Sequence, residues 1–161
     1  MILGLIVAVI ALSVDQLSKY FVAEFFAAAG MAAESFGKYF NLVEAWNTGV
    51  SFSMFNNGGI WGTVLLSAFA IAVVLFLLSW LRNEKCKMIQ IALGMIIGGA
   101  LGNVADRIRF GAVYDFLDFH YKTWHWPAFN AADSFICIGV FLIILHSILT
   151  RKQKSLKELA K

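Results

Sequence analysis

The chain has 161 residues, of which 60% are hydrophobic and 14% are charged. Soluble domains are typically about 45–50% apolar and about 25% charged, so this composition excludes an ordinary water-soluble fold and predicts a membrane protein. The net charge of +3 comes from basic residues that do not mix with exposed aromatic ones, which argues against nucleic acid as a partner. The length fits one domain, residues 1–161.

Four apolar stretches are long enough to cross a bilayer as helices. A hydrocarbon core about 30 Å thick needs roughly 20 apolar residues per helix. The predicted spans are residues 2–26, 60–81, 88–105 and 131–150. They predict a membrane fold built mainly from α-helices.

The distribution of basic residues sets the predicted orientation of these spans. Lys and Arg collect on the cytoplasmic side of membrane proteins. Eight of the 13 basic residues lie in the connector after the second span and in the C-terminal tail, so both segments are placed inside. With four spans the N-terminus is then also cytoplasmic. Residues 27–59 and 106–130 are predicted to face outward.

The first span has a competing interpretation as a secretory signal peptide. Ala27-Ala28-Ala29 resembles the small-residue site at which such peptides are cleaved. The first five residues, however, include no basic residue, and the apolar run contains Asp15 and Lys19. These features favour a retained transmembrane helix.

Ionisable residues inside membrane spans are costly, and each one is therefore a functional hypothesis. Asp15 and Lys19 are spaced i, i+4 on one face of the first helix, where they can form an ion pair. Asp15 lies about 20 Å from the start of this helix at 1.5 Å per residue, in the outer half of the bilayer. A purely structural ion pair is the alternative to a functional one.

The outer segment after the first span has strand character. Residues 39–46 and 50–55 are rich in aromatic and branched side chains, and the turn signal Asn47-Thr48-Gly49 separates them. This pattern predicts a small hairpin at the membrane surface. Residues 27–37 are predicted to form a short interfacial helix before it.

The third span combines small residues with a polar end. It carries three glycines at i, i+4 spacing: Gly94, Gly98 and Gly102. Small residues at this spacing let helix backbones approach closely. At its end, the adjacent Asp106 and Arg107 are predicted to face different partners, while Asn103 lies on the same side as Asp106. Arg107 is predicted to bind a nearby carboxylate, or else simply to reach the interface.

Two further carboxylates frame the start of the fourth span. Asn130 is a good N-cap, which makes Asp133 the third helical residue, where the helix dipole favours a negative charge. Asp115 lies in a strongly apolar segment, which should raise its pKa. If the two carboxylates meet, they form a like-charge pair of the kind that aspartic proteases use. Spacing alone leaves open whether they meet.

Five separated blocks resemble, in order, the motifs of bacterial lipoprotein signal peptidases, also called signal peptidase II or prolipoprotein signal peptidase. They correspond to the patterns DQxxK, NxGxxFS, GNxxDR, VxDF and FNxAD. In this chain they are Asp15-Gln16-Leu17-Ser18-Lys19, Asn47-Thr48-Gly49-Val50-Ser51-Phe52-Ser53, Gly102-Asn103-Val104-Ala105-Asp106-Arg107, Val113-Tyr114-Asp115-Phe116 and Phe129-Asn130-Ala131-Ala132-Asp133. The chain departs from the usual pattern at Val50 and Ser51.

The resemblance implies an aspartic endopeptidase of the bacterial inner membrane, with four helices, a small extracytoplasmic β-sheet and an interfacial helix. It implies cleavage of prolipoprotein signal peptides just before a cysteine that carries diacylglycerol, within membrane lipid. It also implies a monomer, inhibition by globomycin, and no metal or organic cofactor. The matching catalytic residues are Asp115 and Asp133. The matching supporting residues are Asp15, Lys19, Asn47, Asn103, Asp106, Arg107 and Asn130.

Other classes of protein fit the sequence less well. A proton-conducting transporter would need ionisable groups across the whole membrane, whereas here they gather at the outer end. A membrane scaffold would leave Asp115 and Asp133 unexplained. A rhomboid-type serine protease would need GxSG, a GxGD-type aspartyl protease its own motif, and a zinc protease HExxH; none of the three patterns occurs. Within the predicted pair, Asp133 should ionise more easily and Asp115 should hold the proton.

Overall fold

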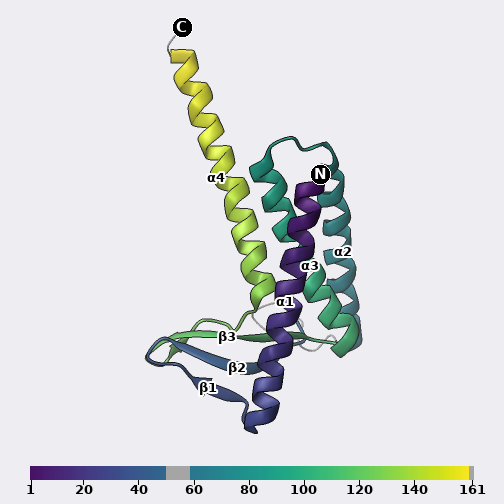
Figure 1. Cartoon of the computed structure of the whole chain (residues 1–161), viewed down its shortest axis with the longest axis vertical. Helices are drawn as coiled ribbons and strands as arrows, with labels where there is room; N and C mark the ends of the chain where they lie inside the picture. The colour runs from purple at the N-terminus through teal and green to yellow at the C-terminus, as the bar shows by residue number, and fades with distance from the viewer. Residues whose placement is uncertain (50–58, 160–161) are drawn as a thin grey trace.

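The computed structural model describes residues 1–49 and 59–159 of the chain. The predicted second strand of the hairpin, residues 50–55, lies outside this range, as do the departures at Val50 and Ser51. Within it, one pair of short strands follows the first of four helices and a second pair follows the third, and both chain ends lie at the end of the bundle opposite the strands (Figure 1).

The four predicted spans are confirmed as helices. They are α1 (Ile2–Ala29), α2 (Gly59–Asn83), α3 (Lys87–Phe110) and α4 (Ala131–Leu159). All four are long and apolar enough to cross a membrane, α4 through its segment Ala131–Arg151. The C-terminal part of α4 runs on beyond the predicted end and projects from the bundle (Figure 1).

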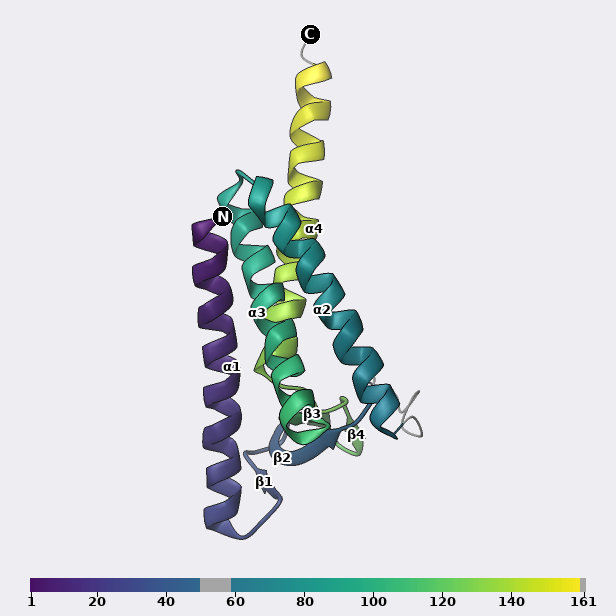
Figure 2. The ribbon, with the colours of Figure 1, turned by 90° about the vertical axis from the view of Figure 1, so that its right-hand side faces the viewer.

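Helix α3 is the centre of the bundle. It packs against α1, α2 and α4, and the turned view shows it between them (Figure 2). The predicted close approach occurs against α1, where Gly94 faces the carbonyl oxygen of Gly4 and Gly98 faces that of Ala8. A Cβ atom at either glycine would collide with the α1 backbone, so the absence of a side chain sets the spacing of the two helices.

The outward faces of the other helices are apolar. Large side chains such as Phe21, Phe69 and Phe141 are 65%, 71% and 61% exposed. A soluble protein rarely leaves so many contiguous apolar side chains uncovered. Together with the four spans, these faces identify the chain as a multi-pass membrane protein.

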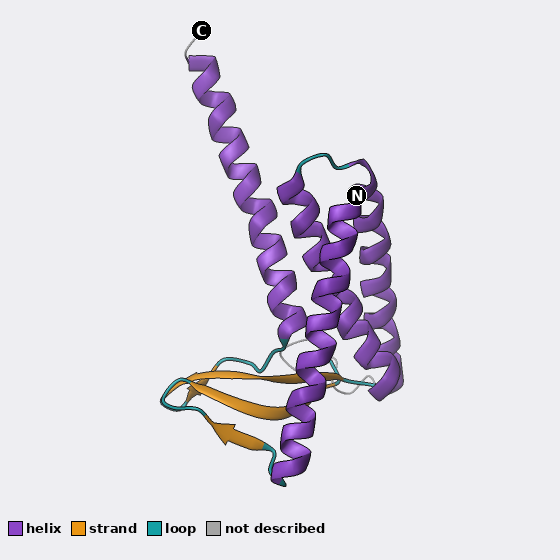
Figure 3. Cartoon of the chain, viewed as in Figure 1, coloured by secondary structure: helices purple, strands orange, loops and turns teal. Residues whose placement is uncertain are grey.

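A four-stranded antiparallel sheet closes the end of the bundle opposite the termini (Figure 3). Its strands, in spatial order, are β1 (Ala33–Ser35), β2 (Phe40–Asn47), β3 (Val113–Tyr121) and β4 (Trp124–His125). The predicted strand at residues 39–46 is thus confirmed as β2. Its neighbours in the described sheet are β1 and the distant β3.

The predicted interfacial helix over residues 27–37 is wrong. Residues 27–29 continue α1, which ends at Gly30 with a left-handed φ of 64° that glycine tolerates well. Ala33–Ser35 then forms β1 and pairs with β2 in the register Ala33↔Val43. The edge of β2 offers backbone hydrogen bonds that local propensity does not reveal, and these override the helical preference of the alanines.

Candidate active site

Asp115 and Asp133 line one cavity of about 220 Å³ at the sheet end of the bundle. Asp115 comes from the start of β3, and Asp133 from the first turn of α4. The other lining residues come from the end of β2, from α2, from α3 and from the beginning of β3: Asn47, Gly49, Leu66, Phe69, Ala70, Asn103, Arg107 and Val113. The tertiary fold therefore brings together the two carboxylates that the sequence left apart.

Asp133 is positioned by the start of its own helix. Its backbone N–H donates to Oδ1 of Asn130 at 3.0 Å, and the Asn130 N–H donates back to Oδ2 of Asp133 at 3.3 Å. This reciprocal arrangement is a capping box, and it confirms the predicted N-cap. It fixes the carboxylate at the positive end of the α4 dipole.

The Asn130 side chain also connects the two carboxylates. It is fully buried, and its Nδ2 donates to Oδ1 of Asp115 at 2.7 Å while its Oδ1 accepts from the Asp133 backbone. The remaining oxygens are held by two more amides. Asn47 donates to Oδ2 of Asp115 at 3.0 Å, and Asn103 donates to Oδ1 of Asp133 at 2.8 Å. Each carboxylate is therefore fixed at both oxygens.

A second cluster, made by Lys19 and two buried carboxylates, lies beside this site and is bonded to it through Asn103. The Lys19 Nζ lies 2.8 Å from Oδ2 of Asp15 and 2.7 Å from Oδ2 of Asp106, and it donates to Oδ1 of Asn103 at 3.2 Å. The predicted pair of Asp15 and Lys19 is thus confirmed. Oδ1 of Asp15 also accepts from the N–H of Ala132 at 2.9 Å, which ties the start of α4 to α1.

Asp106 and Arg107 have different partners, as their adjacency on a helix predicts. Asp106 pairs with Lys19, whereas Arg107 lines the cavity and interacts electrostatically with Asp133 and Asp115. The Arg107 Nε is buried and makes no hydrogen bond within the part of the chain that the structure describes. Arg107 therefore places a positive charge beside the pair, and its Nε is bonded to neither carboxylate.

Three residues of the polar network had no role predicted from the sequence: Gln16, Asn41 and Asp118. Gln16 donates from Nε2 to Oδ1 of Asp106 at 2.9 Å and to the carbonyl of Gly102 at 3.3 Å. Its position in the DQxxK block was the available signal. Asn41 donates at 2.8 Å to Oδ2 of Asp118, whose carboxylate also lies 2.9 Å from Nδ1 of His125. Asp118 thus joins β2 to β4 outside the cavity, where no sequence motif marked it.

The environment of Asp115 favours its protonated form. Burial is the main cause that raises its pKa from 3.8 to about 6. The negative charge of Asp133 acts in the same direction, while the hydrogen bond from Asn47 opposes both. The predicted upward shift for this apolar segment is therefore confirmed.

This raised pKa gives the stability of the protein a defined pH dependence. The folded protein binds the Asp115 proton more tightly than the unfolded chain, so stability falls as pH rises from about 4 to about 6. We expect the wild type to lose about 2–3 kcal/mol of unfolding free energy between about pH 4 and about pH 7 relative to Asp115→Asn. Denaturant unfolding in detergent at both pH values measures this difference. Equal pH dependence of the two proteins would contradict it.

Two fixed carboxylates, one of which favours its protonated form, can act together on a carbonyl group. The ionised member can accept a proton from water, and the protonated member can donate one to the carbonyl oxygen. The buried, amide-lined walls hold both groups in place for this chemistry. In the described part of the chain, no group of three or more His, Cys, Asp or Glu side chains is arranged to hold a metal ion.

Known proteins resemble this chain over most of its length. A sequence profile described as "Signal peptidase (SPase) II" matches residues 7–149. A lipoprotein signal peptidase from Coxiella burnetii strain RSA 331 is 42% identical over 149 residues, covering 91% of this chain and 90% of the relative. Another from Paraburkholderia phytofirmans is 45% identical, covering 88% and 82%. A bacterial membrane enzyme solved by the in meso method at 2.3 Å superposes with a TM-score of 0.78 at 27% identity, covering 94% of this chain and 90% of that one.

Proposed function

Because this chain belongs to the signal peptidase II family, we propose that Asp115 and Asp133 are the catalytic pair with which it removes signal peptides from prolipoproteins. One observation carries the assignment. The two carboxylates line the same cavity and are both bonded to Asn130. The whole chain, residues 1–161, acts as one peptidase domain.

The two carboxylates divide the proton transfers between them. Asp133, ionised at the helix N-terminus, takes a proton from a water molecule whose oxygen attacks the scissile carbonyl carbon. Asp115, protonated, gives its proton to the carbonyl oxygen. When the tetrahedral intermediate collapses, the C–N bond breaks and the amine leaves with the proton held by Asp133, while Asp115 takes back a proton from a hydroxyl of the intermediate as the new carboxyl group forms. The coupled pair is then again singly protonated, with Asp133 ionised and Asp115 protonated.

The supporting residues keep this pair in position. Asn47, Asn103 and Asn130 orient the carboxylate oxygens, and Arg107 limits the repulsion between the two charges. Lys19 with Asp15 and Asp106 holds the middle of α1 against the end of α3 and the start of α4.

The substrate's cleavage site bears a cysteine modified with diacylglycerol. A cavity of about 770 Å³ adjoins Asp133 and supports this assignment. It lies between α4 and the segment 124–129, and aromatic and aliphatic side chains dominate its wall, including Trp124, Trp126 and Ile138. Acyl chains in the surrounding membrane lipid can enter such an apolar cavity laterally.

The proposed location is the bacterial inner membrane, with both termini in the cytoplasm and the sheet on the extracytoplasmic face. The concentration of basic residues in the connector and tail supports this orientation. At that face the end of a membrane-spanning signal peptide comes level with Asp115 and Asp133. The enzyme acts as a monomer, and globomycin occupies its site.

An assay with purified protein tests the proposal. We expect cleavage of a diacylglyceryl-modified prolipoprotein immediately before the cysteine, and no cleavage of the same prolipoprotein without the lipid. Globomycin should abolish the reaction. Mass spectrometry of the released signal peptide identifies the cleaved bond. Equal cleavage of the unmodified precursor would contradict the lipid requirement.

A further inference from the structure

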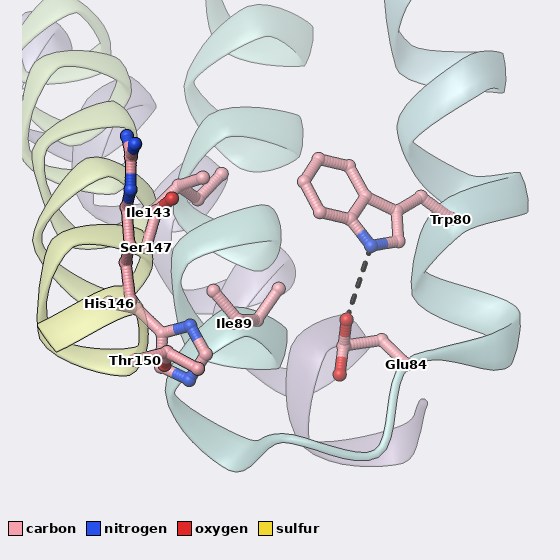
Figure 4. A pocket seen from close by; sticks show the side chains of 8 residues that line it. Trp80, Glu84, Ile89, Ile143, His146, Ser147 and Thr150 are labelled. Carbon is pink, nitrogen blue, oxygen red and sulfur yellow. Dashed lines mark hydrogen bonds between the residues drawn. The ribbon is translucent and has the colours of Figure 1, made fainter. Parts of the chain in front are cut away.

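A second cavity lies at the opposite end of the same three helices. Its volume is about 500 Å³, and its wall consists of Trp80, Glu84, Ile89, Ile143, His146, Ser147, Thr150 and Arg151. In Figure 4, Trp80 and Glu84 face the side chains of α4 across α3. The proposed catalytic mechanism uses none of these residues. In the proposed orientation they lie at the cytoplasmic surface.

Helix periodicity places both cavities on the same side of α3, between the facing sides of α2 and α4, and we call the space between these two helices the groove. Phe69 lines the catalytic cavity and Trp80 the second one, and their separation of 11 residues along α2 corresponds to about three full turns at 3.6 residues per turn. Along α4, Asp133 and Arg151 are 18 residues apart, which corresponds to five full turns. Helices α2 and α4 both pack on α3, so the two matching faces flank it from one end of the membrane to the other.

The length of this groove matches a signal peptide. At 1.5 Å per residue, Phe69 lies about 16 Å from Trp80, and Asp133 about 21 Å from Ser147, along their helix axes. These lengths correspond to roughly 11–14 helical residues. A signal peptide carries an apolar segment of about 7–15 residues between its basic N-terminal region and its cleavage site. With the cleavage site at Asp115 and Asp133, its basic residues reach the second cavity.

The α2 side of this cavity is suited to a basic side chain. Glu84 is the only acidic residue between Glu44 and Asp106. Its carboxylate is held by the Cys86 N–H at 2.7 Å and by the Trp80 Nε1 at 3.2 Å. The bond from Cys86 lowers the pKa of Glu84, so the carboxylate stays ionised. A fixed carboxylate beside an indole ring offers both an ion pair and a cation–π contact.

We propose that the groove between α2 and α4 binds the apolar helix of the signal peptide, and that Glu84 and Trp80 bind a basic side chain of its N-terminal region. The proposal rests on the proposed function, because it needs the cleavage site at Asp115 and Asp133. It makes Glu84 and Trp80 specificity residues that act through substrate binding.

The other charged groups around the cavity restrict where the basic side chain binds. Arg151 lines the α4 side, and the His146 ring lies 3.4 Å from the Cys86 Sγ. A bound lysine or arginine therefore pairs with Glu84 on the α2 side, away from Arg151. An anionic lipid headgroup would instead prefer Arg151 and would be repelled by Glu84, which argues against lipid as the occupant.

The test combines one substitution in the enzyme with one change in the charge of the substrate, and measures all four combinations. Glu84→Gln is assayed on a diacylated prolipoprotein with two lysines in its N-terminal region, and on the same precursor with both lysines changed to glutamine. For the lysine substrate we expect KM to rise about 5-fold at unchanged kcat, the size of a partly exposed charge pair. For the glutamine substrate KM should not change. Glu44→Gln, an exposed residue of β2, is the matched control and should alter neither.

A charge swap covers the case in which Glu84→Gln disturbs the connector. Glu84→Lys should bind a precursor with two N-terminal glutamates better than the lysine precursor, which reverses the wild-type preference. Equal KM changes for both substrates would overturn the proposal, because Glu84 would then act only through the connector. A KM that followed the lipid headgroup of the vesicle instead of the substrate charge would also overturn it. A wrong assignment of the catalytic pair would give a different result, namely a normal kcat for the Asp115→Asn variant.

Discussion

Replacing Asp115 or Asp133 with asparagine should reduce cleavage of a diacylated prolipoprotein by at least about 10³-fold, near the upper part of the range for lost general acid–base catalysis. Asparagine keeps the size and most of the hydrogen bonds of aspartate, but it can neither accept the proton of water nor donate one to a carbonyl. The amides of Asn130, Asn47 and Asn103 surround the pair, so the cavity should keep its shape. The measured quantity is kcat in detergent or vesicles.

Asp118→Asn is the matched control for this experiment. Asp118 lies three residues from Asp115 on the same strand and is also buried, but it bonds Asn41 and His125 outside the cavity that Asp115 and Asp133 line. Its kcat should stay within a few-fold of the wild type. Turnover near the wild-type level in either Asp115→Asn or Asp133→Asn, with the protein inserted and folded, would remove that residue from the pair.

Replacing Lys19 with methionine should cost about 3–5 kcal/mol of stability, the usual effect of breaking a buried ion pair from one side. Methionine fills a similar volume but leaves two carboxylates without their cation. Asp15 is 0% exposed and Asp106 is 2% exposed, so water cannot replace the lost partner. Because Lys19 also bonds Asn103, the carboxylate of Asp133, which we propose to be catalytic, should lose its fixed position and kcat should fall.

Two variants separate this effect from a general loss of charge. Lys38→Met removes an exposed lysine between β1 and β2 and should leave the unfolding free energy within about 0.5 kcal/mol. Adding Asp15→Asn to Lys19→Met should recover part of the loss, since one uncompensated charge disappears. Denaturant unfolding in detergent measures all three proteins. A Lys19→Met protein as stable as Lys38→Met would show that the buried ion cluster does not hold the helices together.

Local features of this protein were predictable from its sequence. The four spans follow from composition, because a helix in lipid must be apolar over a length fixed by the bilayer. The pair of Asp15 and Lys19 follows from i, i+4 spacing, and the capping box of Asn130 and Asp133 from its three-residue separation. In each case the interacting groups lie within about one helical turn. Their geometry is therefore set by the helix itself.

The contacts that build the site come from residues far apart in the chain. Pairing of β2 with β3 sets Ala45 opposite Asp115, and the same strand carries the Asn47 that bonds this carboxylate. Strand β2 also pairs with β1, and this pairing explains why residues 33–35 form a strand where a helix over residues 27–37 was predicted. Strand pairing depends on which neighbouring strand has a free edge in the folded protein, and the sequence of one strand does not reveal this.

The same limit applies to the carboxylates near the outer ends of the spans. By itself, the sequence determined that this is a membrane protein with acidic residues in these positions, and its motifs distinguished Asp115 and Asp133 among them. Only the packing of α3 against α1 and α4, together with the sheet, placed Asp115 and Asp133 in one cavity and left Asp118 outside it. The reason is that burial and partners, which set a carboxylate's chemistry, arise from long-range contacts that residue order leaves undetermined.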